Sequence, residues 1–214
     1  MDETTTKEKI LKRVRDALIS KKENPFKNVD FNTPVFVPSE EEKEIAFARK
    51  LMDMSGTFVY CENEKTLGEN LKSLLSQKGW QDYFVVDKKL EMLLQSLAVP
   101  FQNNPATFNK MTAGITRCEY LIARFGSVLV SSGLDSGRRM FVFPESHIVV
   151  AYTSQVVVEL QEALSGMRKR YREGFPSQMT VITGPSRTAD IEKTLIMGAH
   201  GPRELYVFVV DDED

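Results

Sequence analysis

The stretch that most constrains the fold runs from Met179 to Asp212 and reads MTVITGPSRTADIEKTLIMGAHGPRELYVFVVDD. Residues 179–183 alternate β-branched and apolar residues, as a buried strand does. Pro185 then presets a backbone angle that suits the first turn of a helix. Residues 205–210 form the most apolar run of the chain and predict a second buried strand. The pattern therefore predicts a strand–helix–strand unit with a helix over residues 185–198.

The turn between the first strand and the predicted helix carries the candidate ligand-binding residues. A turn that opens a helix presents unpaired N–H groups and the positive end of the helix dipole, which favour a carboxylate or phosphate. We expect substrate or anion binding by Thr183, Gly184, Pro185, Ser186, Arg187, Thr188 and Asp190, with Gly201 in the following turn. The turn has neither a Walker A sequence nor a Gly-x-Gly-x-x-Gly fingerprint, so nucleotide binding does not follow. A plain helix cap, with Arg187 paired to an acid, explains the same residues and stays open.

The composition fits a single α/β domain of ordinary character. The chain has 214 residues, 42% of them hydrophobic, and a net charge of −2, so the bulk charge favours neither nucleic acid nor a membrane surface. We find no apolar run long enough to span a bilayer, and the polar N-terminus does not resemble a signal peptide. The default expectation is therefore a cytoplasmic protein without a transmembrane segment or nucleic-acid partner.

The pattern along the chain divides it into an N-terminal helical arm with a connector, residues 1–38, and an α/β domain, residues 39–214. In the arm, residues 7–22 predict a basic helix with one apolar stripe, which can dock on a partner, bind an acidic membrane surface or pack on its own domain. From residue 39 on, strand and helix patterns alternate, which predicts a mainly parallel sheet with helices on both faces. The predicted helices span 39–54, 67–79, 88–97, a short part of 111–123, and 154–172. The predicted strands span 57–61, 83–86, 127–131, 139–143 and 148–152, with a hairpin joining 127–131 to 139–143.

Candidate catalytic residues lie where polar turns meet apolar runs. Glu145 and His147 belong to a polar tetrad between two apolar runs, and His200 lies in the turn before the last strand. If the fold brings Glu145, His147 and His200 to the turn at 183–188, they form a proton-transferring or cationic site for a small carboxylate. A structural role is the ordinary one for a lone histidine. Their spacing matches no recognised metal-ligand set, so we predict no metal site.

The segment from Val181 to Asp211 resembles the C-terminal signature of the lactate utilisation protein C family, also called the LUD domain family. A looser similarity runs through FGSVLV and FPESHIVV, residues 125–130 and 143–150. The resemblance implies an α/β fold similar to that of the NagB/RpiA/CoA-transferase group. It also implies an association with a three-protein, iron–sulfur-dependent system that oxidises L-lactate to pyruvate. Kinship of fold alone does not confer a reaction.

The same family usually has an acid-Thr-Gly-Thr sequence before the strand that begins at residue 127. This chain has Arg-Phe-Gly-Ser at 124–127, so the acid and the first threonine are replaced. Gly126 and Ser127 keep the glycine and a hydroxyl, and the resemblance makes them candidate substrate-binding residues. An equally open alternative is that Gly126 serves a strand entry that needs an unusual backbone angle.

Two cysteines, Cys61 and Cys118, are too few for a [4Fe–4S] cluster, which needs four thiolates. We predict that both fill space in the core and that the chain binds no cofactor directly. Iron–sulfur clusters are then expected in the partner proteins that the family resemblance implies.

Three functional hypotheses follow. The leading one is a non-cluster subunit of an L-lactate oxidation system that binds a small carboxylate or organises partner subunits, and it leaves open whether the chain catalyses anything alone. The second is a stand-alone transferase or isomerase acting on a phosphate or CoA-thioester substrate. The third is a regulatory or scaffold protein with a vestigial pocket. A homo-oligomer is compatible with all three.

Overall fold

The structure is a computed structural model that describes residues 5–19, 25–30, 40–189, 195–198 and 200–212. The chain divides into two compact units, residues 1–39 and 40–214. Within the first unit, α1 (Thr6–Ile19) is an amphipathic helix in which no residue is buried. Its first turn is capped by Thr5, whose backbone N–H donates to Glu8 Oε2 at 2.8 Å.

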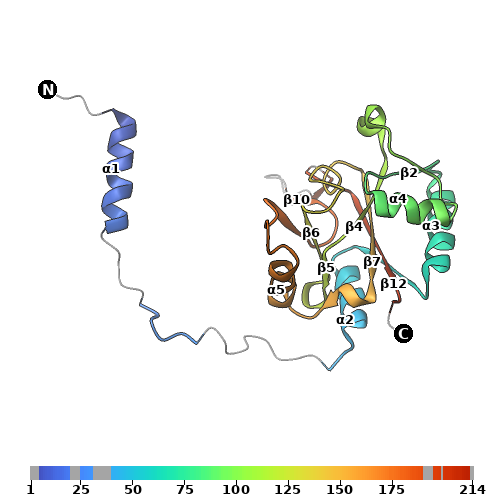
Figure 1. The fold of residues 1–214 in the computed structure, drawn as a ribbon, viewed down its shortest axis with the longest axis horizontal. Coiled ribbons are helices and arrows are strands. Elements are labelled where there is room, and N and C mark those ends of the chain that lie inside the picture. The colour runs from blue at the N-terminus through green and yellow to red at the C-terminus, as the bar shows by residue number, and fades with distance from the viewer. Residues whose placement is uncertain (1–4, 20–24, 31–39, 190–194, 199, 213–214) are drawn as a thin grey trace. The chain divides into compact units, whose positions relative to one another are not determined.

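The second unit contains all the other helices and strands that the structure describes (Figure 1). Its helices are α2 (Lys43–Asp53), α3 (Glu64–Lys78), α4 (Lys88–Ser96) and α5 (Leu160–Arg170), with the 3₁₀ turns η1 (Pro105–Lys110), η2 (Ala123–Phe125) and η3 (Thr153–Gln155). Its first strands are β1 (Thr57–Cys61), β2 (Tyr83–Phe84), β3 (Phe101–Gln102), β4 (Ala113–Arg117), β5 (Tyr120–Ile122) and β6 (Ser127–Ser131). The later strands are β7 (Ser146–Tyr152), β8 (Val156–Val157), β9 (Met179–Ile182), β10 (Arg187–Ala189), β11 (Leu195–Met197) and β12 (Glu204–Val210).

A six-stranded sheet in the order β1-β12-β7-β4-β2-β3 forms the centre of this unit. Every neighbouring pair in it is parallel. The two central strands, β7 and β12, are nearly continuous apolar runs, because both of their faces are covered. The mainly parallel α/β fold predicted from the alternation of elements is therefore confirmed.

The two faces of the central sheet are covered differently. Helices α3 and α4 pack on one face, where Leu71 and Leu94 join a core with strand residues such as Ile115 and Phe208. On the other face lie α2 and a second sheet of order β8-β5-β6-β9, which the sequence analysis did not predict. The strands of this second sheet alternate in the usual way: residues of one face join the central core, and those of the other pack against α5.

Four local predictions are wrong. The helix expected over 154–172 begins only at Leu160, because the residues before it form η3 and β8, and β8 pairs with β5. The helix expected within 111–123 is replaced by two strands: β4, with the sequence AGITR, pairs between β2 and β7, and β5 pairs between β6 and β8. The strand expected over 139–143 is a series of turns, closed by the Phe143 N–H donating to the Arg139 carbonyl at 2.9 Å. The helix expected over 185–198 is an antiparallel hairpin of β10 and β11, in which β-branched residues oppose each other at Thr188 and Ile196. Local β preference and strand pairing outweigh the helical spacing in this last segment.

Candidate functional site

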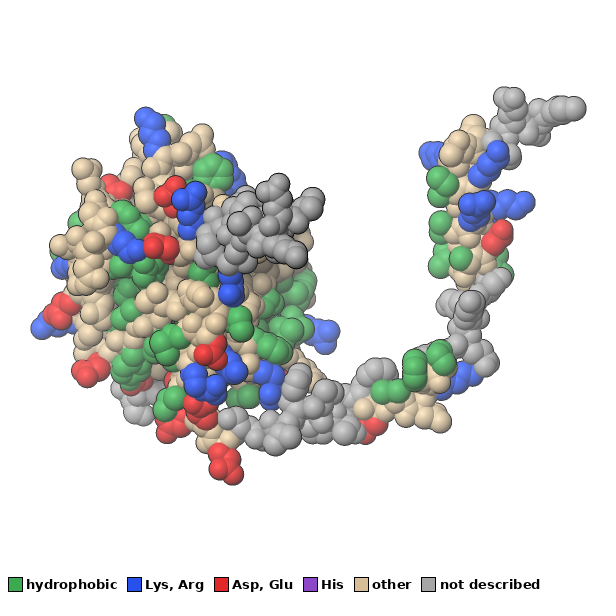
Figure 2. Space-filling model, turned by 180° about the vertical axis from the view of Figure 1, so that it is seen from behind, with side chains coloured by type: hydrophobic (Ala, Val, Ile, Leu, Met, Phe, Trp, Pro, Cys, Tyr) green, Lys and Arg blue, Asp and Glu red, His purple; other side chains and the backbone are tan. Residues whose placement is uncertain are grey.

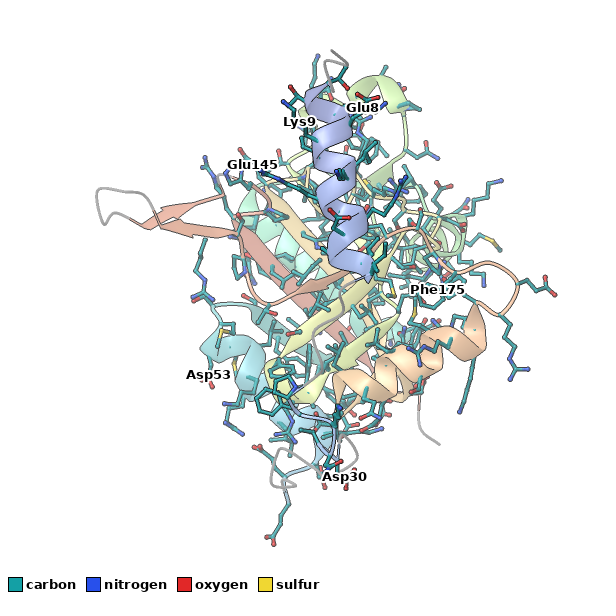
Figure 3. The ribbon with its side chains drawn as sticks, turned by 90° about the vertical axis from the view of Figure 1, so that its left-hand side faces the viewer. Glu8, Lys9, Asp30, Asp53, Glu145 and Phe175 are labelled. Atoms are coloured by element: carbon teal, nitrogen blue, oxygen red, sulfur yellow. The ribbon has the colours of Figure 1, made fainter. Side chains whose placement is uncertain are left out.

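A shallow groove of about 430 Å³ lies where β7 and β12 begin, beside the β10–β11 hairpin. It contains two of the predicted catalytic residues, Glu145 and His200, and the predicted binding residue Gly201. Glu145 directly precedes β7 and Arg203 directly precedes β12, so the parallel register of these strands brings the two residues together. The Arg203 N–H donates to the Glu145 carbonyl at 2.7 Å and fixes this arrangement. Figure 3 labels Glu145 on the side of the domain where the β10–β11 hairpin lies.

The turn at 183–187 joins the same region through backbone contacts. The Ser186 N–H donates to the Pro202 carbonyl at 2.8 Å, and the Gly198 N–H donates to the Ser186 carbonyl at 3.0 Å. A Cβ atom at Gly201 would lie 3.4 Å from Ser186 Cβ, so this turn packs directly on Gly201. Segments of the predicted site that lie far apart in the chain therefore converge around one groove.

The turn at 183–187 meets the carboxyl end of α2 rather than the amino end of a helix. A Cβ atom at Gly184 would lie 2.3 Å from the Met54 carbonyl oxygen, which follows α2, and the φ angle of Gly184 is +76°. The Arg187 Nη2 atom donates to the same carbonyl at 3.1 Å. A cation at the negative end of a helix dipole is favourable, so Arg187 acts here as a helix cap.

The helix start on which the anion site was predicted is thus absent. Anion binding by the turn stays a prediction without that support. Asp190 lies outside the described residues, and Thr188 is described only as part of the backbone of β10. Pro185, which belongs to this turn, is buried.

Gly126 and Ser127 have contacts that explain both residues by packing. The φ angle of Gly126 is +60°, and a Cβ atom there would lie 2.2 Å from Leu51 N and 2.4 Å from Lys50 C in α2. Ser127 is fully buried, and its Oγ atom shares a hydrogen bond of 2.8 Å with Thr183 Oγ1. These contacts support the alternative in which Gly126 serves an unusual backbone angle and close approach.

His147 lies in the core and does not line the groove. Its side chain is 0% exposed, and its Nε2 atom shares a hydrogen bond of 2.8 Å with Thr116 Oγ1. Its Nδ1 atom has no hydrogen-bond partner among the described residues. Burial lowers the pKa of His147 to about 4, which keeps the ring neutral. The convergence of His147 with His200, which the sequence left open, is not found in the structure, because His147 is buried in the core while His200 is exposed in the groove.

A polar cavity of about 490 Å³ lies at the opposite, carboxyl ends of the central strands. Arg117, Glu119 and Arg170 line it, and the sequence analysis singled out none of them for ligand binding. They were missed because residues 111–123 were predicted to contain a helix. A strand that ends at Arg117 would have placed Arg117 and Glu119 at a strand end, where ligand sites of α/β proteins lie.

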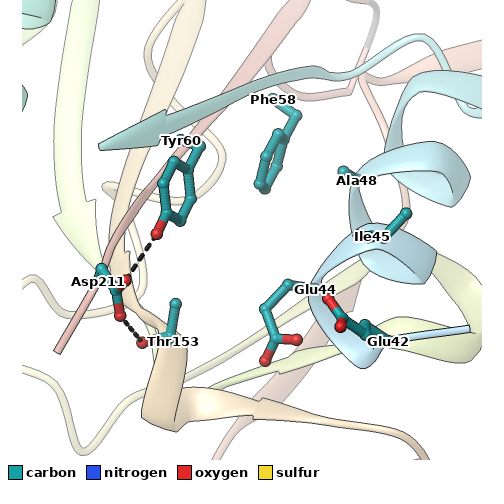
Figure 4. A pocket seen from close by; sticks show the side chains of 8 residues that line it. All are labelled: Glu42, Glu44, Ile45, Ala48, Phe58, Tyr60, Thr153 and Asp211. Carbon is teal, nitrogen blue, oxygen red and sulfur yellow. Dashed lines mark hydrogen bonds between the residues drawn. The ribbon is translucent and has the colours of Figure 1, made fainter. Parts of the chain in front are cut away.

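A third hollow, of about 460 Å³, lies between α2 and β1 (Figure 4). It contains the carboxylates of Glu42, Glu44 and Asp211 beside aromatic and aliphatic side chains. Tyr60 donates a hydrogen bond of 2.7 Å to Asp211 Oδ2, which raises the pKa of Tyr60. Three carboxylates around one hollow disfavour a carboxylate or phosphate ligand there.

No group of three or more His, Cys, Asp or Glu side chains that could hold a metal ion occurs in the part of the chain that the structure describes. Cys61 and Cys118 are both buried and free. Burial raises the pKa of the Cys118 thiol, with a further contribution from the charge of Glu119. Across the described ranges, no helix is long and apolar enough to cross a membrane.

Comparison with known proteins gives a consistent set of relatives. The sequence model of the LUD domain matches residues 35–210. A lactate utilization protein C from Macrococcus caseolyticus is 26% identical over 172 residues, which cover 73% of this chain and 74% of the relative. A lactate utilization protein C from Bacillus subtilis is 34% identical over 113 residues, covering 51% of this chain and 47% of the relative.

A solved structure supports the same fold. The crystal structure of a DUF162 family protein from Deinococcus radiodurans has a TM-score of 0.60 and 20% identity, covering 81% of this chain and 99% of that one. The matched stretch spans only 44% of an uncharacterized Neisseria meningitidis relative that is 35% identical, and about half of the Bacillus subtilis protein.

Proposed function

The chain belongs to the LUD domain family, and from that premise we propose that it is a subunit of an iron–sulfur-dependent system that oxidises L-lactate. The observation that carries this proposal is the LUD match over residues 35–210 together with relatives named lactate utilization protein C. The subunit holds no cluster of its own in this proposal, because its two cysteines cannot supply four thiolates. The electrons taken from lactate then pass to clusters in partner proteins.

The groove at the start of β7 and β12 is the proposed site for a small carboxylate. Arg203 is exposed there, and its side chain has no ion pair with any residue that the structure describes. A guanidinium group can hold a carboxylate through two parallel hydrogen bonds. Oxidation of L-lactate to pyruvate breaks the O–H and Cα–H bonds and releases two electrons and two protons. Glu145 and His200 line the same groove as candidate acceptors for the two protons, and the two electrons pass to the partner proteins.

Helix α1 is the proposed docking element for a partner subunit. One side of the helix is an apolar stripe of exposed side chains: Ile10, Leu11, Val14 and Leu18. Lysine and arginine side chains occupy the other sides of α1, as Figure 2 shows. An apolar stripe beside cations suits a hydrophobic groove with an acidic rim on another protein.

Ligand binding tests the first part of the proposal. L-lactate and pyruvate should raise the thermal midpoint of the wild-type chain, and Arg203→Gln should remove most of that shift. Arg172→Gln is the matched control, because Arg172 is an exposed arginine that does not line the groove. Equal shifts in the wild type and Arg203→Gln would exclude Arg203, and the absence of any shift would exclude this groove as the carboxylate site.

Co-purification tests the docking part. The tagged full chain should retain iron–sulfur proteins from cells grown on L-lactate, and a Leu11→Ser/Leu18→Ser variant should lose them. Met92→Ser is the control, since Met92 is 71% exposed on α4 and lies outside the arm. Retention of the partners by the double variant would contradict docking through α1.

A further inference from the structure

The polar cavity at the carboxyl ends of the central strands lies at a topological switch point. Strands β2 and β4 are parallel neighbours in the sheet. After β2 the chain enters α4 on one face of the sheet, and after β4 it enters the second sheet on the other face. A crevice opens where two neighbouring parallel strands send the chain to opposite faces, and α/β proteins bind ligands in such crevices. The cavity takes Lys89 from α4 and Arg117 from β4, so it lies at this crevice.

A buried carboxylate holds the first arginine of the cavity. Asp87 is 0% exposed and accepts hydrogen bonds from Lys89 N at 3.0 Å and Leu90 N at 3.2 Å at the start of α4. Its other oxygen accepts from Arg117 Nε at 2.8 Å, and Arg117 Nη2 lies 2.6 Å from that oxygen. The Arg117 side chain is 27% exposed and lines the cavity.

A second buried carboxylate holds the second arginine in the same way. Glu119 is 0% exposed, and its Oε2 atom lies 2.5 Å from Arg170 Nη1. Its Oε1 atom accepts hydrogen bonds from Ser131 Oγ and Tyr171 OH, both at 2.6 Å. The Arg170 side chain is 44% exposed and lines the cavity with Arg117.

The arrangement is more than a structural ion pair needs. Burying a carboxylate costs free energy, because the charge loses its hydration. Here two carboxylates are buried at one crevice, and each is paired with an arginine that stays partly exposed. The cavity lining carries three cations, Lys89, Arg117 and Arg170, against the carboxylates of Glu119 and Asp135, and Glu119 is already paired with Arg170. Lys89 is exposed at the same cavity and adds a third positive charge.

We propose that this switch-point cavity binds a metabolite through a carboxylate or phosphate group held by Arg117 and Arg170, with Lys89 as a further contact. The volume of about 490 Å³ falls in the range of roughly 300–1,000 Å³ typical of ligand pockets. Burial raises the pKa of the Cys118 thiol, which lines the cavity, and so disfavours the reactive thiolate there. This site is distinct from the groove at the amino ends of the strands, and the inference does not depend on the proposed function.

Calorimetric titration with inorganic phosphate and with malonate, at constant ionic strength, tests the proposal and separates the two oxyanion sources. The wild-type chain should bind at least one of the probes. Arg117→Gln and Arg170→Gln should each weaken that binding about tenfold or more, because each removes a charge-assisted contact. Lys89→Gln should weaken it several-fold, and it leaves both buried carboxylates with their arginines, so it tests the site even if an arginine variant fails to fold.

Two control variants exclude a general effect of net charge. Lys88→Gln changes the neighbouring exposed lysine of α4, and Arg168→Gln changes an exposed arginine of α5, and neither residue lines the cavity. Both should bind the probe as the wild type does. The proposal is overturned if the wild type binds neither probe, if Lys89→Gln binds as tightly as the wild type, or if the control variants lose binding equally.

Discussion

Replacing Gly126 by alanine should destabilise the domain strongly, because two separate costs meet at this position. The φ angle of +60° places any other residue in the left-handed region, at a cost of about 1–2 kcal/mol. The new Cβ atom would also lie 2.2 Å from Leu51 N, a backbone atom of α2 that cannot rotate away. Overpacking of this kind costs about 1–3 kcal/mol more, so the free energy of unfolding should fall by about 3 kcal/mol or more.

Gly79 provides the matched control. It ends α3 at a φ of +68°, and nothing lies within 4 Å of the Cβ atom that alanine would add. Gly79→Ala should therefore cost only the backbone strain of about 1–2 kcal/mol. Urea unfolding of both variants and the wild type at one temperature measures the difference. Equal losses of stability in the two variants would refute the close contact between Gly126 and α2, and would reopen a ligand-binding role for Gly126.

Three further predictions concern His147, Arg187 and the two cysteines. Burial lowers the pKa of His147 to about 4 in the folded protein, against 6.5 in the unfolded chain. The contribution of the neutral ring to the free energy of unfolding is therefore complete above pH 6.5 and is lost as the pH falls toward 4. The wild type should lose about 2 kcal/mol more than His147→Asn between pH 7 and pH 5 in urea unfolding, and parallel pH profiles would contradict this. Arg187→Ala should lower stability by up to about 1 kcal/mol through loss of the bond to the Met54 carbonyl, and an unchanged urea midpoint would remove Arg187 from the cap. The protein purified without oxygen should be colourless, since only Cys61 and Cys118 are available, and stoichiometric iron and sulfide would contradict that.

The sequence predicted the elements that carry a clear apolar pattern, either a nearly continuous apolar run, as in β7 and β12, or one apolar face, as in α2, α3 and α4. Strands β1, β6, β7 and β12 and helices α2, α3 and α4 lie close to their predicted ranges. The end of α3 at Gly79 was predicted because a left-handed glycine has a local signature. The second sheet was missed as a sheet, although two of its strands, β6 and β9, lie at predicted strands; β9 pairs antiparallel with β6 and does not join the central sheet. Strands β5 and β8 were missed because each has only two or three residues and carries little periodicity of its own.

The candidate sites, too, were predicted only where a local pattern of residues marks them. Glu145 and His200 were found at polar turns beside apolar strands, and the parallel register of β7 and β12 brings these turns together. The full burial of His147 depends on the packing of both sheets, which no local pattern of residues reports. Arg117 and Arg170 owe their positions to Asp87 and Glu119, which lie 30 and 51 residues away in the chain. Such pairs become visible only once the topology has placed β2, β4 and α5 at one crevice.

The most direct test of the central claim is the rate at which L-lactate reduces an electron acceptor in extracts of cells that normally make this chain. Extracts of cells lacking the chain should lose this activity, and added purified chain should restore it. The purified chain alone should show no turnover, because the clusters that accept the electrons belong to its partners. Unchanged lactate oxidation without the chain, or full activity of the chain by itself, would contradict the account.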